Sequence, residues 1–175
     1  MINVNLRALT TTDIEKTLSW HNKKEISNLY SGHPFPVNLE FEKKWYENIL
    51  TSNIPTTVFG IEHIETNELI GITILKNINL INRCSEFAIY IGNDSYLGKG
   101  LSTEATILTL KFGFHNLGLN RIYLKVLSKN SKALNLYKKI GFKHEGILKE
   151  SVFKENEFID EVIMAILKKE FDGKL

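Results

Sequence analysis

The sequence of 175 residues lacks several features that would point to particular classes of protein. Its single cysteine, Cys84, rules out an internal disulfide and a cysteine-based metal site. No apolar run approaches the roughly 20 residues that a membrane-spanning helix needs. The first seven residues contain no basic segment followed by an apolar stretch, so we expect no signal peptide and a cytoplasmic location.

The charge and composition exclude other classes. The formal net charge of +2 is too small to indicate nucleic-acid binding, and 43% hydrophobic with 24% charged residues is ordinary for a globular protein. The five histidines show no metal-ligand spacing, so we expect no metal. There is no repeat, linker or low-complexity segment, and the length fits one domain over residues 1–175.

Two periodicities alternate along the chain and predict a mixed α/β fold. Residues 12–20, 41–53, 101–117 and 131–140 have helical patterns, the first with a capping box at Thr12 and Glu15, and residues 23–36 look irregular. Alternating patterns predict strands at residues 4–8, 57–64, 69–78, 84–92, 119–127, 142–153 and 157–168. Antiparallel strands followed by a β-α-β unit give a mixed sheet, which we expect to carry helices on both faces.

The segment Tyr-Leu-Gly-Lys-Gly-Leu-Ser at residues 96–102 joins a predicted strand to a predicted helix. Gly98 and Gly100 let the backbone pass close to a bulky ligand, and the first turn of the following helix favours an anion such as pyrophosphate. The alternative is an ordinary left-handed turn with a surface lysine. A nucleotide-triphosphate loop fits poorly, because Lys99 is followed by Gly100 and not by serine or threonine.

A second segment, Asn-Ser-Lys-Ala-Leu-Asn-Leu-Tyr-Lys-Lys-Ile-Gly-Phe at residues 130–142, completes a family resemblance. Together the two segments resemble the GNAT N-acetyltransferases, nearest the branch with ribosomal-protein and spermidine acetyltransferases. The resemblance is strongest over residues 86–142. It implies a three-layer fold with a mixed, largely antiparallel sheet of six to seven strands and about four helices. Ser95 departs from the family, which usually has arginine or glutamine there.

The resemblance also implies acetyl-CoA as cosubstrate and a place for it. Strands 86–92 and 121–127 would splay to admit the pantetheine arm, and an N–H near Tyr90 or Ile91 would polarise the acetyl carbonyl. The cofactor-binding residues implied are Ile89, Tyr90, Ile91, Leu97, Gly98, Lys99, Gly100, Leu101, Ser102, Asn130, Ala133 and Tyr137.

Three of the candidate residues have both a chemical and a structural interpretation. Tyr137 is the general acid by resemblance, and by its helical pattern a core tyrosine. Asn130 either binds pantetheine or caps the helix that follows it. Glu86 either takes the proton of the amine or is a strand-end glutamate paired with Arg83 or Arg121.

The resemblance implies direct attack of a primary amine on the thioester. The acceptor stays open among a protein N-terminus, a polyamine, an amino sugar and an aminoglycoside, and a homodimer is left open too. His33 belongs to a segment that should border the acceptor cleft. The alternative from another class is a non-catalytic acyl-CoA-binding sensor with the same fold.

Overall fold

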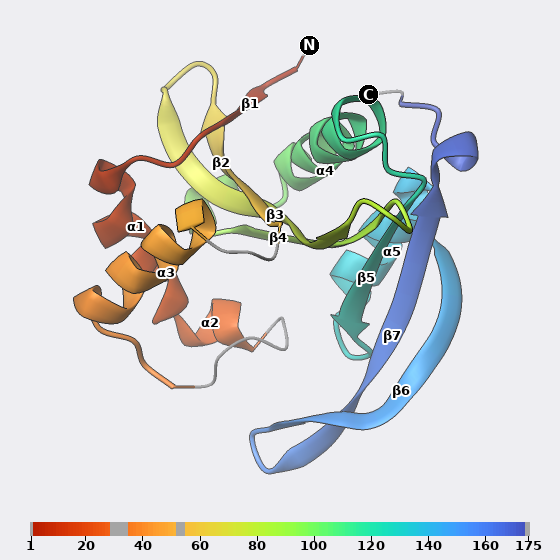
Figure 1. Ribbon diagram of the computed structural model, residues 1–175. Coiled ribbons are helices and arrows are strands. Elements are labelled where there is room, and N and C mark those ends of the chain that lie inside the picture. Colours follow the sequence, from red (N-terminus) through yellow and green to blue (C-terminus); the bar gives the residue numbers. More distant parts are fainter. Residues whose placement is uncertain (1, 29–34, 52–54, 174–175) are drawn as a thin grey trace.

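The structure, a computed structural model, describes residues 2–28, 35–51 and 55–173, so His33 and the predicted end of the second helix near Asn53 lie outside it. The described residues form one seven-stranded sheet of order β1-β2-β3-β4-β5-β7-β6 (Figure 1). The strands are β1 Val4–Arg7, β2 Thr57–His63, β3 Glu68–Asn79, β4 Cys84–Ile91, β5 Arg121–Leu127, β6 Lys143–Lys154 and β7 Glu157–Leu167. The helices are α1 Ile14–His21, α2 Lys24–Ser27, α3 Leu39–Thr51, α4 Leu101–Lys111 and α5 Ser131–Ile140.

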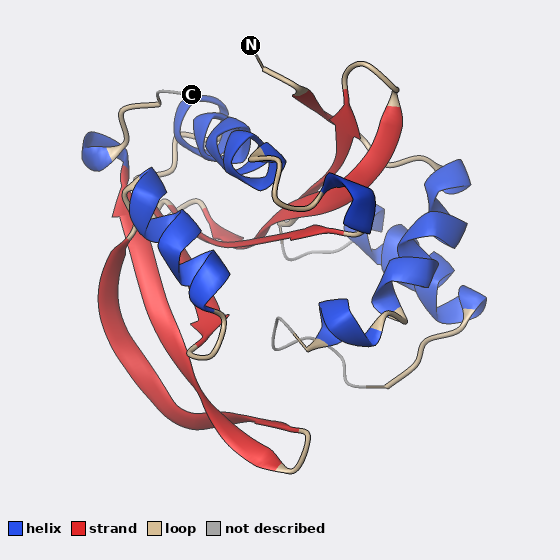
Figure 2. Cartoon of the chain, turned by 180° about the vertical axis from the view of Figure 1, so that it is seen from behind, coloured by secondary structure: helices blue, strands red, loops and turns tan. Residues whose placement is uncertain are grey.

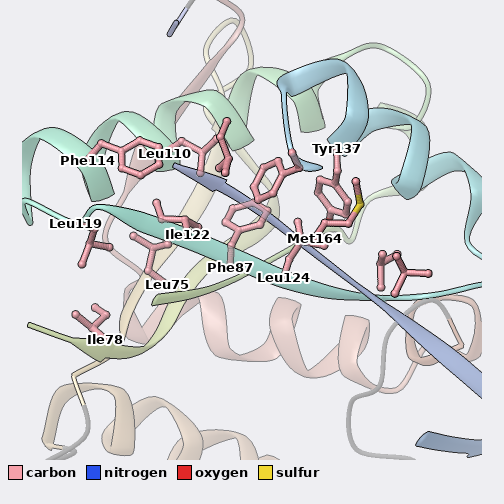
Figure 3. Packing of buried hydrophobic residues seen from close by; sticks show 14 residues of the cluster. Leu75, Ile78, Phe87, Leu110, Phe114, Leu119, Ile122, Leu124, Tyr137 and Met164 are labelled. Atoms are coloured by element: carbon pink, nitrogen blue, oxygen red, sulfur yellow. The ribbon is translucent and has the colours of Figure 1, made fainter. Parts of the chain in front are cut away.

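The predicted fold class is confirmed, because the sheet is mixed and has helices on both faces. Helices α4 and α5 cover one face, and α1, α2 and α3 gather on the other (Figures 1 and 2). Alternation along each strand divides the core accordingly. On the α4 and α5 face, Phe87 packs with Leu75, Leu110, Phe114 and Tyr137 (Figure 3). On the opposite face, buried residues of α1 and α2 pack with Leu69 and Ile72 of β3.

The strand pairing contains one short parallel ladder. Every neighbouring pair in the sheet is antiparallel except β4 and β5, and their pairing covers only Cys84 with Arg121, Ser85 with Ile122, and Glu86 with Tyr123. Both strands continue beyond that point, to Ile91 and Leu127. Figure 1 shows β5 turning away from β4 as the two strands proceed. The sheet therefore opens between its fourth and fifth strands.

Two local predictions were wrong. The capping box lies two residues earlier than predicted, at Thr10 and Asp13. The Asp13 carboxylate accepts from the backbone N–H of Thr10 at 2.8 Å and is also paired with Arg7 at 2.8 Å. The segment expected to be irregular contains the short helix α2. The helix predicted over residues 101–117 is present, as α4 followed by a π-helical turn, Phe112–Asn116. The position of the capping box depends on a contact with another element, because Arg7 of β1 pairs with Asp13.

Close packing at the end of β4 holds α1 against the sheet. A methyl group built at Gly92 would lie 2.0 Å from the indole of Trp20, so only glycine admits this ring. Trp20 is buried and meets the ring of Tyr90 edge-on at 6.1 Å. The open part of β4 thus has the end of α1 directly beside it.

Candidate active site

The opening between β4 and β5 leaves backbone groups available inside the sheet. In a strand, alternate N–H and C=O groups point to each of the two neighbours. Beyond Glu86 the side of β4 that faces β5 has no strand partner among the residues that the structure describes, and Ile89, Tyr90 and Ile91 lie on this segment. An extended chain with amide groups of its own, such as a pantetheine arm, could bond to this edge as an added strand would.

The glycine loop lies just beyond the same end of β4. Gly98 and Gly100 have φ values of +75° and +80°, in the left-handed region that favours glycine. Apart from the adjacent residues in the chain, no atom of a described residue lies within 4 Å of a Cβ built on either glycine, so the loop surface is open. Gly100 is the N-cap of α4, and the N–H groups of Leu101 and Ser102 have no acceptor within the helix.

Among the other side chains of the loop, some are buried in the core and some are exposed. Leu101 is buried in the core with Ala105, so only its backbone can reach a ligand. Leu97 is exposed, and the Lys99 ammonium lies 5.2 Å from the centre of the Tyr96 ring. Ser95 is exposed, and its N–H donates to Asn93. The loop thus offers backbone N–H groups, the positive end of α4 and one lysine, which together suit a pyrophosphate.

The start of α5 borders a pocket at the open end of β5. Asn130 caps this helix, since its Oδ1 accepts from the N–H of Ala133 at 3.1 Å. Asn130 and Leu127 line a pocket of about 340 Å³ that reaches across to Asn28 of the α2 segment. The cap and the pocket wall are compatible roles, because an amide side chain has further donor and acceptor sites.

Tyr137 lies one helical turn beyond Ala133 and is buried, at 8% exposure. Its ring meets Phe87 of β4 edge-on at 6.2 Å, so it packs on the α5 face of the opening (Figure 3). No hydrogen bond of its hydroxyl to another described residue is present. Burial raises the pKa of Tyr137 well above its ordinary value of about 10, so the phenol stays protonated at neutral pH. A protonated phenol here can donate to a thiolate.

Glu86 occupies the last position of β4 that is paired with β5, where the opening between the two strands begins. Its neighbour Phe87 faces Tyr137, so alternation directs Glu86 to the α1–α3 face. The expected pairing with Arg83 or Arg121 was wrong. Glu86 pairs with Lys76, which stands opposite it on β3, at 3.0 Å, while Arg121 pairs with Glu145. Asn77 also donates to Glu86, at 3.3 Å.

Comparison with known proteins decides the family. A family model described as acetyltransferase (GNAT) domain matches residues 3–143, which is more than half of the chain. The chain is a GNAT acetyltransferase. A spermidine N(1)-acetyltransferase of Vibrio cholerae is 32% identical over 96% of this chain and 95% of its own, and one of Escherichia coli strain K12 is 28% identical over 97% and 88%. A crystal structure of the Vibrio cholerae spermidine N-acetyltransferase in complex with CoA and spermine superimposes with a TM-score of 0.90 at 30% identity, covering 96% of this chain and 97% of that one.

These relatives confirm that this GNAT acetyltransferase is an acetyl-CoA-dependent N-acetyltransferase, and they give no support to the alternative of a non-catalytic sensor. The residues present fit acetyl-CoA as cosubstrate. The open glycine loop suits its pyrophosphate, and the unpaired edge of β4 suits its extended arm. Among the described residues, no helix is both long and apolar enough to span a membrane.

Two acidic groups lie on the α1–α3 face of this acetyltransferase, and sequence reasoning missed the first of them. Glu42 of α3 is fully buried and hydrogen-bonded to His21 of α1. Glu161 of β7 is 5% exposed and stands opposite Leu127, a wall of the 340 Å³ pocket. For Glu42, the one hint in the sequence was the i, i+4 spacing of its two partners, Thr17 and His21. The sequence does mark Glu161, together with Glu157 and Asp160, as an acidic residue near the last hairpin that belongs to a solvated turn or attracts a cationic amine. The structure buries Glu161 within β7, which the sequence pattern did not predict.

Replacing Gly100 by valine tests the pyrophosphate site. The substitution adds a branched side chain at φ +80°, where the loop has to meet the phosphates. We expect the thermal shift given by acetyl-CoA to disappear; a ligand at a hundredfold excess over its Kd stabilises by about 2.7 kcal/mol. Gly118→Val is the matched control, because Gly118 also has a positive φ of +66° and open surroundings but lies outside the loop. If folded Gly100→Val still shows the full thermal shift with acetyl-CoA, the phosphates bind at another place on the protein.

Replacing Tyr137 by phenylalanine tests the general acid. The ring and its contact with Phe87 remain, but the proton donor is lost, so kcat should fall by roughly 10²–10⁴-fold while acetyl-CoA affinity holds. Steady-state kinetics and acetyl-CoA titration measure the two effects. The control is Tyr46→Phe on α3. It removes a hydroxyl that donates to the backbone carbonyl of Leu9, and it should leave kcat near normal. Near-normal turnover of Tyr137→Phe, measured where chemistry limits the rate, would make Tyr137 a core residue only.

Proposed function

We propose that this enzyme acetylates a polyamine such as spermidine or spermine. The observation that carries the proposal is the likeness, over nearly the whole of both chains, to a spermidine N-acetyltransferase whose structure contains CoA and spermine. A polyamine is a flexible chain of primary and secondary amines that is cationic at neutral pH. Its recognition therefore needs acidic groups beside the site of transfer.

Acidic groups on the side opposite α5 support a cationic acceptor. Glu161 is buried, and one of its carboxylate oxygens has no hydrogen-bond partner among the described residues, while the other accepts from Ser151 at 3.1 Å. A buried carboxylate oxygen without a partner is costly, and a cation brought nearby would offset that cost. Glu155 and Glu157 line the pocket beside it, although Lys24 and Lys129 partly neutralise them.

We infer that transfer occurs by direct attack in a ternary complex. The acceptor enters from the α1–α3 face, the thioester lies in the opening between β4 and β5, and Tyr137 protonates the leaving thiolate from the α5 face. Cys84 is an unsuitable nucleophile for a covalent alternative, because it lies at the closed, paired end of β4. The proposal places the two reactants on opposite sides of the opening, so neither has to leave before the other binds.

A panel of amines tests the acceptor. Spermidine and spermine should have kcat/KM values at least about tenfold above those of butylamine, glucosamine, kanamycin and a peptide N-terminus, because only the polyamines present several charges along a narrow chain. Release of CoA thiol gives the rate, and the mass of the product gives the acetylated site. Added salt should reduce the advantage, since it screens charge attraction with a Debye length of about 8 Å at 0.15 M.

The same panel can refute the polyamine proposal while leaving the enzyme class intact. If the peptide or a sugar is preferred, and spermidine is acetylated no faster than butylamine, the acidic groups do not select a polycation. The acceptor is then the amine that the panel identifies.

A further inference from the structure

The α1–α3 face holds a carboxylate and a histidine joined to each other. Glu42 on α3 has a side chain that is fully buried, with an exposed fraction of 0%. Its Oε2 lies 2.6 Å from Nδ1 of His21, and its Oε1 lies 2.5 Å from Oγ1 of Thr17. Thr17 and His21 are one helical turn apart on α1, so both partners come from the same face of that helix. A buried carboxylate persists only with such partners.

This arrangement fixes the state of the imidazole. A carboxylate only accepts hydrogen bonds, so Nδ1 of His21 carries a proton, and in the neutral imidazole the lone pair is then on Nε2. The ring is also held between Trp45, edge-on at 5.4 Å, and Tyr90, at 6.2 Å. The His21 side chain nevertheless keeps 19% of its surface exposed. Contacts with Glu42, Trp45 and Tyr90 therefore fix the orientation of the His21 ring, and part of the ring stays accessible.

The accessible side of His21 faces the region where the acceptor would enter. His21 lines a pocket of about 390 Å³ together with Phe35 and Phe153. This pocket shares Asn28, Lys154 and Glu155 with the 340 Å³ pocket at the open end of β5. The ring of Tyr90, which His21 contacts, belongs to the unpaired part of β4. The histidine thus stands between the acceptor side and the opening in the sheet.

We propose that His21 is the catalytic base that deprotonates the attacking amine, and that Glu42 is its positioning residue. The amine arrives as an ammonium ion and gives one proton to Nε2 of His21, which later passes it to solvent. The neutral nitrogen then forms the C–N bond as the C–S bond breaks, and Tyr137 protonates the thiolate. The second proton lost by the nitrogen restores Tyr137. Overall, ammonium and thioester give amide, thiol and one released proton.

The geometry favours His21 over Glu86 for this step. Glu86 is held by Lys76 and Asn77, so a proton arriving there would displace an ion pair. No other described residue is paired with Nε2 of His21, so a proton can arrive there without displacing an ion pair, and Glu42 at Nδ1 balances the charge that the ring gains. The inference rests on acetyl transfer to a primary amine and not on which amine is used.

Kinetics of variants, with acetyl-CoA and the best amine of the panel, test the proposal. His21→Gln should lower kcat by about 10²–10³-fold, within the usual span for a general base, with acetyl-CoA affinity retained. Glu42→Gln keeps the shape and can still accept from Nδ1, but it lacks the charge, so kcat should fall by about tenfold with KM changed less than threefold. His144→Gln on β6 and Glu47→Gln on α3, both exposed, are the matched controls and should behave as wild type.

Chemical rescue separates catalysis from structure. His21→Ala should regain activity when imidazole is added, in proportion to the concentration of its neutral form and not of imidazolium. Substituted imidazoles of higher basicity should rescue better at equal free-base concentration. The same additions should do nothing for Glu86→Gln or Tyr137→Phe, and circular dichroism should show that each variant is folded.

Two outcomes would overturn the proposal. If His21→Gln is folded and keeps kcat within threefold of wild type, His21 is not the base, and a large loss in Glu86→Gln would assign that role to Glu86. If His21→Ala loses activity that no imidazole restores, His21 is a structural residue. A preference for a peptide or sugar over spermidine would refute the polyamine proposal alone, because the same variants can be assayed with that amine. If the wild type acetylates no amine in the panel, both proposals fail.

Discussion

The early end of the β4–β5 pairing is the constraint on which the rest of the site depends. Three residue pairs join the two strands, and then each continues with one edge unpaired. An open edge within a sheet is costly unless something satisfies its N–H and C=O groups. The helices on either side keep the opening in place: Tyr137 of α5 packs on Phe87 at one face, and Trp20 of α1 packs on Gly92 and Tyr90 at the other.

The opening also divides the chemistry between the two faces. On one side of the opening, the glycine loop and the start of α5 provide backbone groups, and Tyr137 provides a protonated phenol. The other side carries the acidic groups, with Glu42 behind His21 and Glu161 near the end of β5. A cationic amine and a thioester can therefore approach the same gap from opposite directions. In the proposed mechanism, one face of the opening is the donor side and the other is the acceptor side.

The sequence predicted the features that depend on local pattern. Strand alternation, helical spacing and the two glycines before Leu101 are local, so the fold class, the loop and the Asn130 cap were accessible. Features made by distant contacts were not. The pairing of Glu86 with Lys76 depends on the β3–β4 register, and the cap at Asp13 depends on Arg7. The Glu42–His21 contact joins two helices, so the spacing of Thr17 and His21 within α1 was a hint that could not identify Glu42 as their partner.

Amide hydrogen exchange on β4, measured residue by residue with and without CoA, tests the account most directly. Alternate N–H groups of residues 87–91 point into the opening and have no strand partner there. The account predicts that these amides exchange quickly in the free enzyme and at least about tenfold more slowly with CoA bound, together with the amides of residues 97–102. Protection of the glycine loop alone, with β4 unchanged, would contradict it, because the acyl arm would then lie outside the sheet.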